Sequence, residues 1–228
     1  MKAIALLGGP ENKWPADLKQ QLLLARKKQV LLIGVDRGSI LLEELGFVPD
    51  LAVGDFDSLK PKELAQIEAN VSDIRYSAAA KDFTDTELMI RYAFEDYQVD
   101  SLTMYGATGG RIDHFLNNFL MCLHPQMRPF AEKMVLIDEQ NAISFYNPGQ
   151  HQVQRLAGYS YFGVATLTAV TDLNIKHARY DLEHYCRDYP VSFSSNEFLP
   201  ASDDFELSFA KGVVAVIQAK DLDRFQNI

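Results

Sequence analysis

The pattern of apolar residues changes near the middle of this chain of 228 residues. Up to about residue 125, short apolar segments such as residues 2–8, 30–36 and 51–57 alternate with stretches whose apolar residues recur at helical spacing. Beyond about residue 134, short apolar segments follow one another with turn residues between them. The first pattern is typical of a mostly parallel sheet with flanking helices, and the second of an antiparallel sandwich or barrel. We therefore expect an α/β domain followed by an all-β sandwich.

The segment HPQMRPFAEK, residues 124–133, is the most linker-like part of the chain between the two patterns. We place the boundary there, with an α/β catalytic domain over residues 1–128 and a β-sandwich domain over residues 129–228. In the second domain, the apolar segments FELSFA and VVAVIQA form a pair joined by Lys211 and Gly212.

Local signals mark the helices of the first domain. Pro15 opens PADLKQQLLLARKK, Gly46 follows SILLEEL where a helix would stop, and Thr84 and Glu87 have the spacing of a capping box. The segment RIDHFLNNFLMCLH has apolar residues at 112, 115, 116, 119, 120 and 123. That spacing predicts a helix with one buried face.

Composition excludes several classes of protein. Hydrophobic residues make up 47% and charged residues 23%, which is typical of a globular domain. Since no segment has the roughly 20 apolar residues of a membrane-spanning helix, and the first apolar run is too short for a secretion signal, we expect a cytoplasmic protein without a membrane partner. The net charge of −9 argues against a nucleic-acid partner. Cys122 and Cys186 lie too far apart to indicate a disulfide framework or a structural zinc site.

Polar residues collect where the expected strands of the first domain end. In an open parallel sheet, ligands bind outside the carboxyl ends of the strands, and these ends share one edge. Four such places stand out: GVDRG with Asp36 and Arg37, GDFDS with Asp55 and Asp57, SAAAKDFTD with Lys81, Asp82 and Asp85, and the loop YGATGGRIDH.

Carboxylates crowded at one edge repel one another unless a cation lies between them. Mg²⁺ takes oxygen ligands, often one or two carboxylates completed by water and substrate phosphates. Each motif also has a simpler explanation: Asp pairs form turns, Asp85 would favour a helix N-terminus, GATGG occurs in turns without a ligand, and Arg111 and His114 could lie on a solvated helix face. These simpler explanations account poorly for all four motifs meeting at one edge.

The motifs GVDRG, PDLAVGDFDSL, KDFTDTEL and GATGGRIDHFLNN, in this order and at these separations, resemble those of the bacterial thiamine pyrophosphokinases. The resemblance runs from about residue 30 to 120 and continues more loosely to the C-terminus. It implies an α/β catalytic domain joined to a β-sandwich, and a homodimer whose active sites are shared between chains. It also implies transfer of the pyrophosphoryl group of ATP to thiamine, with Mg²⁺ required, giving thiamine diphosphate and AMP.

The resemblance also implies roles for individual residues. Asp57 and Asp85 would be direct magnesium ligands, with Asp55 as a ligand or proton acceptor. In SFSSNEF, Ser195 and Asn196 would help bind thiamine. The remaining matched positions would shape the ATP site: Asp36, Lys81, Asp82, Thr108, Gly109, Gly110, Arg111, Asp113 and His114, together with Arg37, which stands where the family commonly has a small residue.

Two other classes of function remain open from the residues alone. A metal-dependent phosphohydrolase would use the same carboxylates with water as the nucleophile. A non-catalytic sensor of thiamine or metal would bind without turnover, although Lys81 and Arg111 argue against it because metal binding alone does not need them.

Overall fold

The computed structural model describes residues 1–77 and 83–220. The chain divides into two compact units, Met1–Glu139 and Gln140–Ile228. The sequence predicts a first domain that ends at residue 128. The first unit continues to Glu139 because Met134–Ile137 (β6) pairs in parallel with the strand Ser101–Tyr105 (β5).

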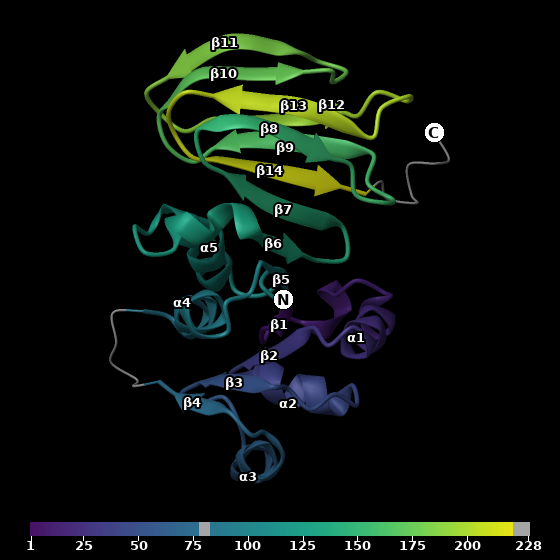
Figure 1. The fold of residues 1–228 in the computed structure, drawn as a ribbon, viewed down its shortest axis with the longest axis vertical. Helices are drawn as coiled ribbons and strands as arrows, with labels where there is room; N and C mark the ends of the chain where they lie inside the picture. The colour runs from purple at the N-terminus through teal and green to yellow at the C-terminus, as the bar shows by residue number, and fades with distance from the viewer. Residues whose placement is uncertain (78–82, 221–228) are drawn as a thin grey trace. The chain divides into compact units, whose positions relative to one another are not determined.

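The first unit is built on a parallel sheet, as the sequence predicts (Figure 1). Its strands lie in the order β6-β5-β1-β2-β3-β4, and every pairing among them is parallel. All five residues of β2 are buried, which is typical of a central parallel strand covered on both faces. The strands not yet given are β1 (Lys2–Leu6), β2 (Leu31–Val35), β3 (Leu51–Gly54) and β4 (Ile74–Tyr76).

Helices connect these strands, and the ends of α2 and α4 follow the local signals, whereas α1 begins at Leu18, three residues after the Pro15 expected to open it. Thr84 caps α4: its Oγ1 accepts from the Glu87 N–H (3.3 Å), and Glu87 Oε2 accepts from the Thr84 N–H (2.8 Å). Gly46, at φ 92°, ends α2. The α-helices are α1 (Leu18–Lys27), α2 (Arg37–Glu44), α3 (Pro61–Asn70), α4 (Asp85–Arg91) and α5 (Ile112–Leu120), and a π-helical turn, Tyr92–Asp96, continues α4.

Helix α5 departs from its expected burial. Ile112, Leu116 and Leu120 lie one helical turn apart and are 73%, 46% and 43% exposed. Asn118 is the residue of this helix that is buried. The prediction of a single buried apolar face is therefore wrong here, because part of the apolar surface of α5 faces outward.

The second unit is an antiparallel sandwich of two sheets, also as predicted. One sheet has the order β12-β9-β14-β7 and the other β11-β10-β13-β8. Phe162 of β9 stacks on Phe205 of β13 at 4.0 Å, so rings from the two sheets meet in the core. The strands are β7 (Asn141–Tyr146), β8 (Gly149–Gln154), β9 (Tyr161–Thr166), β10 (Val170–Lys176), β11 (Leu182–Arg187), β12 (Ser192–Glu197), β13 (Asp204–Phe209) and β14 (Val214–Ala219).

Two details of the sandwich differ from what the sequence predicts. β11 was not expected, because its residues are mostly exposed and polar, as on an edge strand. β13 and β14 are consecutive but belong to different sheets, so Lys211 and Gly212 lead the chain across the sandwich rather than around a hairpin.

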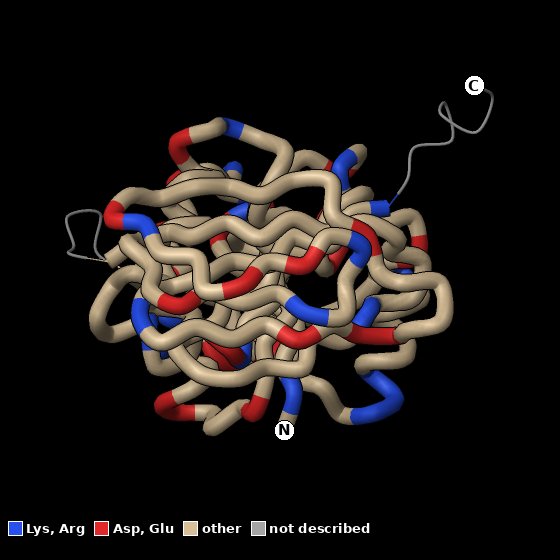
Figure 2. Tube along the Cα trace, turned by 90° about the horizontal axis from the view of Figure 1, so that it is seen from above, with Lys and Arg blue, Asp and Glu red and all other residues tan. Residues whose placement is uncertain are grey.

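Charge is spread along the chain. Acidic and basic residues are interspersed along the trace in Figure 2, so no single segment carries the net charge of −9. Within residues 1–77 and 83–220, every helix is too short or too polar to cross a membrane.

Candidate active site

The carboxyl ends of β1, β2, β3 and β5 share one edge of the first unit, because these strands are parallel neighbours. Asp36 follows β2 directly, Asp55 follows β3, and the glycine-rich loop at residues 106–111 follows β5. The structure thus brings three of the predicted motifs to one edge. Asp85, at the start of α4, joins them there through the side-chain cluster that it forms with Asp36 and Asp55.

Asp36, Asp55 and Asp85 form a cluster of half-buried carboxylates, with one oxygen of each within 4.8 Å of the others. In an octahedral Mg²⁺ site, ligand oxygens stand about 3 to 4.2 Å apart, so small side-chain rotations would bring these three into range. The donor set is all oxygen and anionic, which suits this cation. The residues present therefore fit a magnesium ion.

An unusual backbone conformation places the Asp36 carboxylate. Asp36 has φ 46° and ψ −122°, and its N–H donates to the Val53 carbonyl at 2.9 Å. Its Oδ1 accepts from the N–H of Phe56 at 3.3 Å, which links the ends of β2 and β3. A Cβ at Gly54 would lie 2.0 Å from this oxygen, so position 54 must be glycine for the carboxylate to stay there.

Phe56 anchors the loop that carries the two aspartates. It adopts φ 57° and is only 2% exposed, in a cluster with Ile40, Ile67 and Val71. Since Phe56 points into this core, its neighbours Asp55 and Asp57 stay toward solvent, half-buried and exposed respectively. The Asp57 N–H donates to Asp55 Oδ1 at 3.2 Å, and the Asp57 carboxylate lies outside the three-carboxylate cluster.

Asp85 is held at the first position of α4. The Ser77 hydroxyl donates to Asp85 Oδ1, which joins the end of β4 to the start of the helix. The positive end of the helix dipole also favours a carboxylate at this position. Lys81 and Asp82, both predicted site residues, lie outside the described residues.

The glycine-rich loop after β5 is fixed by contacts that the sequence did not indicate. The Asn118 side chain, in the buried part of α5, donates to the Ala107 carbonyl at 2.9 Å. The Thr108 hydroxyl donates to Asp138 Oδ2 at 2.9 Å. Gly9, just after β1, donates its N–H to the Gly106 carbonyl at 2.9 Å. The pair Gly8-Gly9 directly after the first strand was the available signal for this second glycine loop.

Arg111 and Asp113 lie at the open end of this loop and bind each other. Arg111 Nη2 is 2.5 Å from Asp113 Oδ2, and Arg111 Nε donates to Asp113 Oδ1 at 3.1 Å. The guanidinium lowers the pKa of the Asp113 carboxyl through this contact. Both side chains are mostly exposed, as are Arg37, Gly109, Gly110 and His114, so the guanidinium remains accessible to an anionic ligand.

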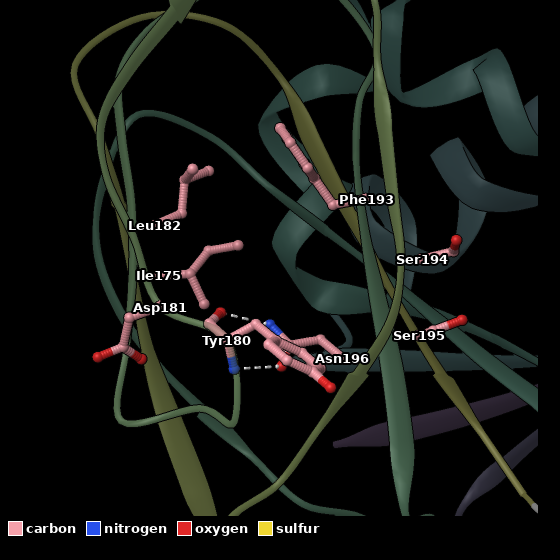
Figure 3. Close-up of a pocket in the computed structure, with 8 residues that line it drawn as sticks. All are labelled: Ile175, Tyr180, Asp181, Leu182, Phe193, Ser194, Ser195 and Asn196. Atoms are coloured by element: carbon pink, nitrogen blue, oxygen red, sulfur yellow. Dashed lines mark hydrogen bonds between the residues drawn. The ribbon is translucent and has the colours of Figure 1, made fainter.

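A pocket of about 510 Å³ lies in the second unit, between β10, β11 and β12 (Figure 3). Ile175, Leu182 and Phe193 provide its apolar surface. A β-bulge in β12, where Ser195 has φ 63°, brings Ser194 and Ser195 to the rim, with their hydroxyls directed away from Ile175 and Leu182. The other lining residues are Tyr180, Asp181 and Asn196.

Comparisons with known proteins agree with this two-part arrangement. Residues 22–134 match the catalytic domain of thiamin pyrophosphokinase, and residues 150–214 match its vitamin B1 binding domain. The thiamine pyrophosphokinase of Bacillus subtilis (strain 168) is 32% identical over 225 residues, covering 97% of this chain and 100% of the relative.

Solved structures show the same likeness over the whole chain. A thiamin pyrophosphokinase family protein from Enterococcus faecalis is 33% identical, with a TM-score of 0.87, covering 97% of this chain and 100% of that one. The thiamine pyrophosphokinase from Bacillus subtilis is 30% identical, with a TM-score of 0.80 and the same coverage. This chain belongs to the thiamine pyrophosphokinase family.

Proposed function

We propose that this protein transfers the pyrophosphoryl group of ATP to the hydroxyl of thiamine, giving thiamine diphosphate and AMP. The observation that carries the proposal is the carboxylate cluster of Asp36, Asp55 and Asp85 at the sheet edge that also presents the glycine-rich loop. The activity itself follows from membership of the family. The carboxylates and the loop at this edge are suited to bind a metal-bound triphosphate.

The metal site is the first part of the proposal. Asp55, Asp57 and Asp85 would hold Mg²⁺, with Asp36 as a fourth carboxylate beside them. The bound cation would neutralise negative charge on the phosphates of ATP as the reaction proceeds. Asp57 is exposed and two residues from Asp55, and in this proposal its side chain would turn toward the cluster when the metal binds.

The remaining groups would bind and align the two substrates. The exposed Arg111 fork can exchange Asp113 for phosphate oxygens, which it can contact with two parallel hydrogen bonds. The loop of Thr108, Gly109 and Gly110 offers backbone N–H groups to the same phosphates. Holding the attacking hydroxyl in line with the β-phosphorus would provide most of the rate gain, since a loose transition state needs little help from a strong base.

The second unit would bind thiamine in the pocket that Ser195 and Asn196 help to line. We further propose a cytoplasmic homodimer in which the carboxylate edge of one subunit works with the thiamine pocket of the other. This arrangement follows the family resemblance and gives each active site one part from each chain.

The test is to incubate the protein with ATP, Mg²⁺ and thiamine and to identify both products. We expect thiamine diphosphate and AMP in equal amounts, and no reaction after Mg²⁺ is removed with a chelator. Release of phosphate from ATP without thiamine would instead indicate a phosphohydrolase. Binding of thiamine without turnover would indicate a sensor.

A further inference from the structure

Arg75, in the middle of β4, makes polar contacts in two directions. Its Nε and Nη2 donate to the Asp73 carboxylate at 3.1 and 3.0 Å, and its Nη1 donates to Asp96 Oδ2. Asp73 comes directly before β4, whereas Asp96 is the last residue of the π-helical turn that follows α4. Arg75 therefore joins the edge strand of the parallel sheet to the C-terminal end of α4.

Two tyrosines complete the surroundings of this guanidinium. Arg75 Cζ lies 4.4 Å from the centroid of the Tyr92 ring and 5.7 Å from that of Tyr97. The Tyr97 hydroxyl donates to Asp73 Oδ2 at 2.7 Å. Burial, together with this hydrogen bond, raises the pKa of Tyr97 to about 12, so the hydroxyl remains a donor at neutral pH. The tyrosines thus hold both the guanidinium and its carboxylate partner.

The π-helical turn brings both rings to the same guanidinium. The Tyr97 N–H donates to the Tyr92 carbonyl at 3.0 Å, five residues earlier. In an α-helix, side chains five residues apart point about 140° away from each other, so the two rings would diverge. A π-turn is wider and is found frequently at functional sites. The irregular end of α4 is therefore matched to the side chain of Arg75.

β4 depends on such polar contacts more than α4 does. It has three residues, lies at the end of the sheet beside β3, and its side chains are half-buried or exposed (Figure 1). By contrast, α4 is anchored in the core by Met89 and Ile90, both 0% exposed. The contacts of Arg75 therefore fix a weakly packed strand against a helix that the core already holds.

The other end of β4 reaches the carboxylate cluster. Ser77 directly follows the strand, and its N–H donates to the Gly54 carbonyl at 3.0 Å. The Ser77 hydroxyl donates to Asp85 Oδ1, in the first turn of α4. Groups that hydrogen-bond to a metal ligand orient it toward the metal. A shift of β4 relative to α4 would move Ser77 and turn the Asp85 carboxylate away from Asp36 and Asp55.

We propose that Arg75 is a positioning residue for the metal site: by fixing β4 against the end of α4, it keeps Ser77 where its hydroxyl orients the Asp85 carboxylate. The proposal rests on the function proposed above, because it takes the carboxylate cluster as the site of a divalent cation. Arg75 supplies no ligand, since its guanidinium is cationic, and it acts through the strand.

Binding of Mn²⁺ in the absence of ATP tests the proposal. Mn²⁺ takes the same oxygen ligands as Mg²⁺, and electron paramagnetic resonance measures the free ion. We expect Arg75→Ala and Ser77→Ala each to weaken Mn²⁺ binding about 10-fold, the lower end of the range for residues that support metal ligands. The double variant Arg75→Ala/Ser77→Ala should bind no more weakly than the weaker single variant, because both changes act on one contact.

Two conservative variants separate geometry from charge. Arg75→Lys should weaken Mn²⁺ binding as Arg75→Ala does, because lysine keeps the charge but lacks the planar fork that reaches Asp73 and Asp96 together. Tyr92→Phe should bind Mn²⁺ as the wild type does, because it keeps the ring beside the guanidinium. Full binding by Arg75→Lys would show that position 75 contributes only its charge, and would overturn the proposal.

Arg26 provides a matched control. It donates to Asp50 Oδ1 at 2.7 Å and to the Val48 carbonyl, and Asp50 directly precedes β3 as Asp73 precedes β4. These contacts join β3 to α1, which carries none of the predicted site residues. Arg26→Ala and Arg75→Ala should both lower the unfolding temperature, but only Arg75→Ala should weaken Mn²⁺ binding. A residue with a merely structural role would behave as Arg26 does.

The outcomes separate this inference from the proposed function. A wild-type protein that makes no thiamine diphosphate would overturn the function, and one that also binds no Mn²⁺ would overturn both. Mn²⁺ binding by Arg75→Ala at the level of Arg26→Ala would overturn the inference alone. Should Arg75→Ala fail to fold, Tyr97→Phe decides, because it removes only the bond to Asp73. It should weaken Mn²⁺ binding about 2- to 5-fold, and wild-type binding would overturn the inference.

Discussion

Gly54 makes room for the carboxylate of Asp36. A Cβ at position 54 would lie 2.0 Å from Asp36 Oδ1 and 2.8 Å from its Cγ, well inside contact distance. The same Oδ1 accepts a hydrogen bond from the Phe56 N–H. The close approach of Asp36 to Gly54 therefore fixes the position of the end of β2 relative to the end of β3 and the aspartate loop. A substitution that adds one methyl group at position 54 therefore tests whether this placement of the Asp36 carboxylate matters for activity.

We predict that Gly54→Ala lowers kcat/KM roughly 100-fold, because displacement of a catalytic group by about 1 Å can have an effect of that size. Steady-state kinetics at several Mg²⁺ concentrations would measure the loss, and thermal unfolding would show that the protein is folded. Gly46→Ala is the control: Gly46 has φ 92° and open space around its Cβ position, so alanine there should lower stability by about 1 kcal/mol and leave kcat/KM unchanged. Equal losses of activity in both variants would contradict the prediction.

The second prediction concerns the carboxylates. Asp55→Asn, Asp57→Asn and Asp85→Asn should each lower kcat by about 100-fold or more and raise the Mg²⁺ concentration needed for half-maximal rate, since each removes a charged ligand. Asp36→Asn separates charge from structure, because an Asn carbonyl can still accept the Phe56 N–H. It should raise the Mg²⁺ requirement while the protein unfolds at an unchanged temperature. A wild-type Mg²⁺ requirement in any of the four would remove that residue from the site.

The strand ends could be predicted from the sequence because the apolar segments and the turn residues after them are local signals. The parallel order then places Asp36, Asp55 and the loop at residues 106–111 at one edge. Other features depend on distant parts of the chain. The support that Asn118 gives to Ala107 requires α5 to fold back against its own preceding loop, and no spacing in the sequence shows this.

The side-chain bonds of Asn196 and the burial of α5 show the same limit. SFSSNEF indicates a polar turn, but the bonds of Asn196 to Tyr180 join β12 to the loop between β10 and β11, sixteen residues earlier in the chain. The 3.6-residue period of α5 shows an apolar face but not what covers it, and Ile112 is 73% exposed. Periodicity reports the direction of side chains, whereas burial depends on which elements pack against them.

Arg111 provides the third prediction. Its planar group contacts both oxygens of Asp113, which shows that the fork is presented in the geometry that phosphate oxygens also accept. Arg111→Lys keeps the charge and loses the fork, so we expect kcat/KM for ATP to fall about 10- to 100-fold. Arg91→Lys is the control, because Arg91 at the end of α4 also forms an ion pair, with Glu95 in the π-helical turn that follows, and its activity should stay at the wild-type level. Unchanged activity in Arg111→Lys would leave Arg111 without a role in phosphate binding.

The two cysteines should differ sharply in reactivity. Burial raises the pKa of the Cys122 thiol from 9.0 to about 12, so at pH 8 it stays protonated and unreactive. Cys186 is exposed on β11. We expect a thiol-alkylating reagent to modify one site in the native protein and both after unfolding, as measured by mass spectrometry. Because the raised pKa keeps the proton bound in the folded state, Cys122 should also lower stability as pH rises from about 9 toward 12. Rapid native labelling of Cys122 would contradict this prediction.

The last prediction is that each active site combines two chains. Asp85→Asn removes a carboxylate from the edge of the first unit, and Asn196→Asp places a carboxylate against the Tyr180 carbonyl that Asn196 now donates to at 2.8 Å. Each variant should be inactive alone. After mixing and subunit exchange, a hybrid dimer would carry both defects in one of its sites and two intact halves in the other. Thiamine diphosphate formation should therefore recover to about a quarter of the wild-type rate, because hybrids make up half of a random mixture and have one working site each.

Exchange would be verified by mass spectrometry of differently tagged chains. Hybrids that form but remain as inactive as their parents would show that both halves of a site come from the same chain.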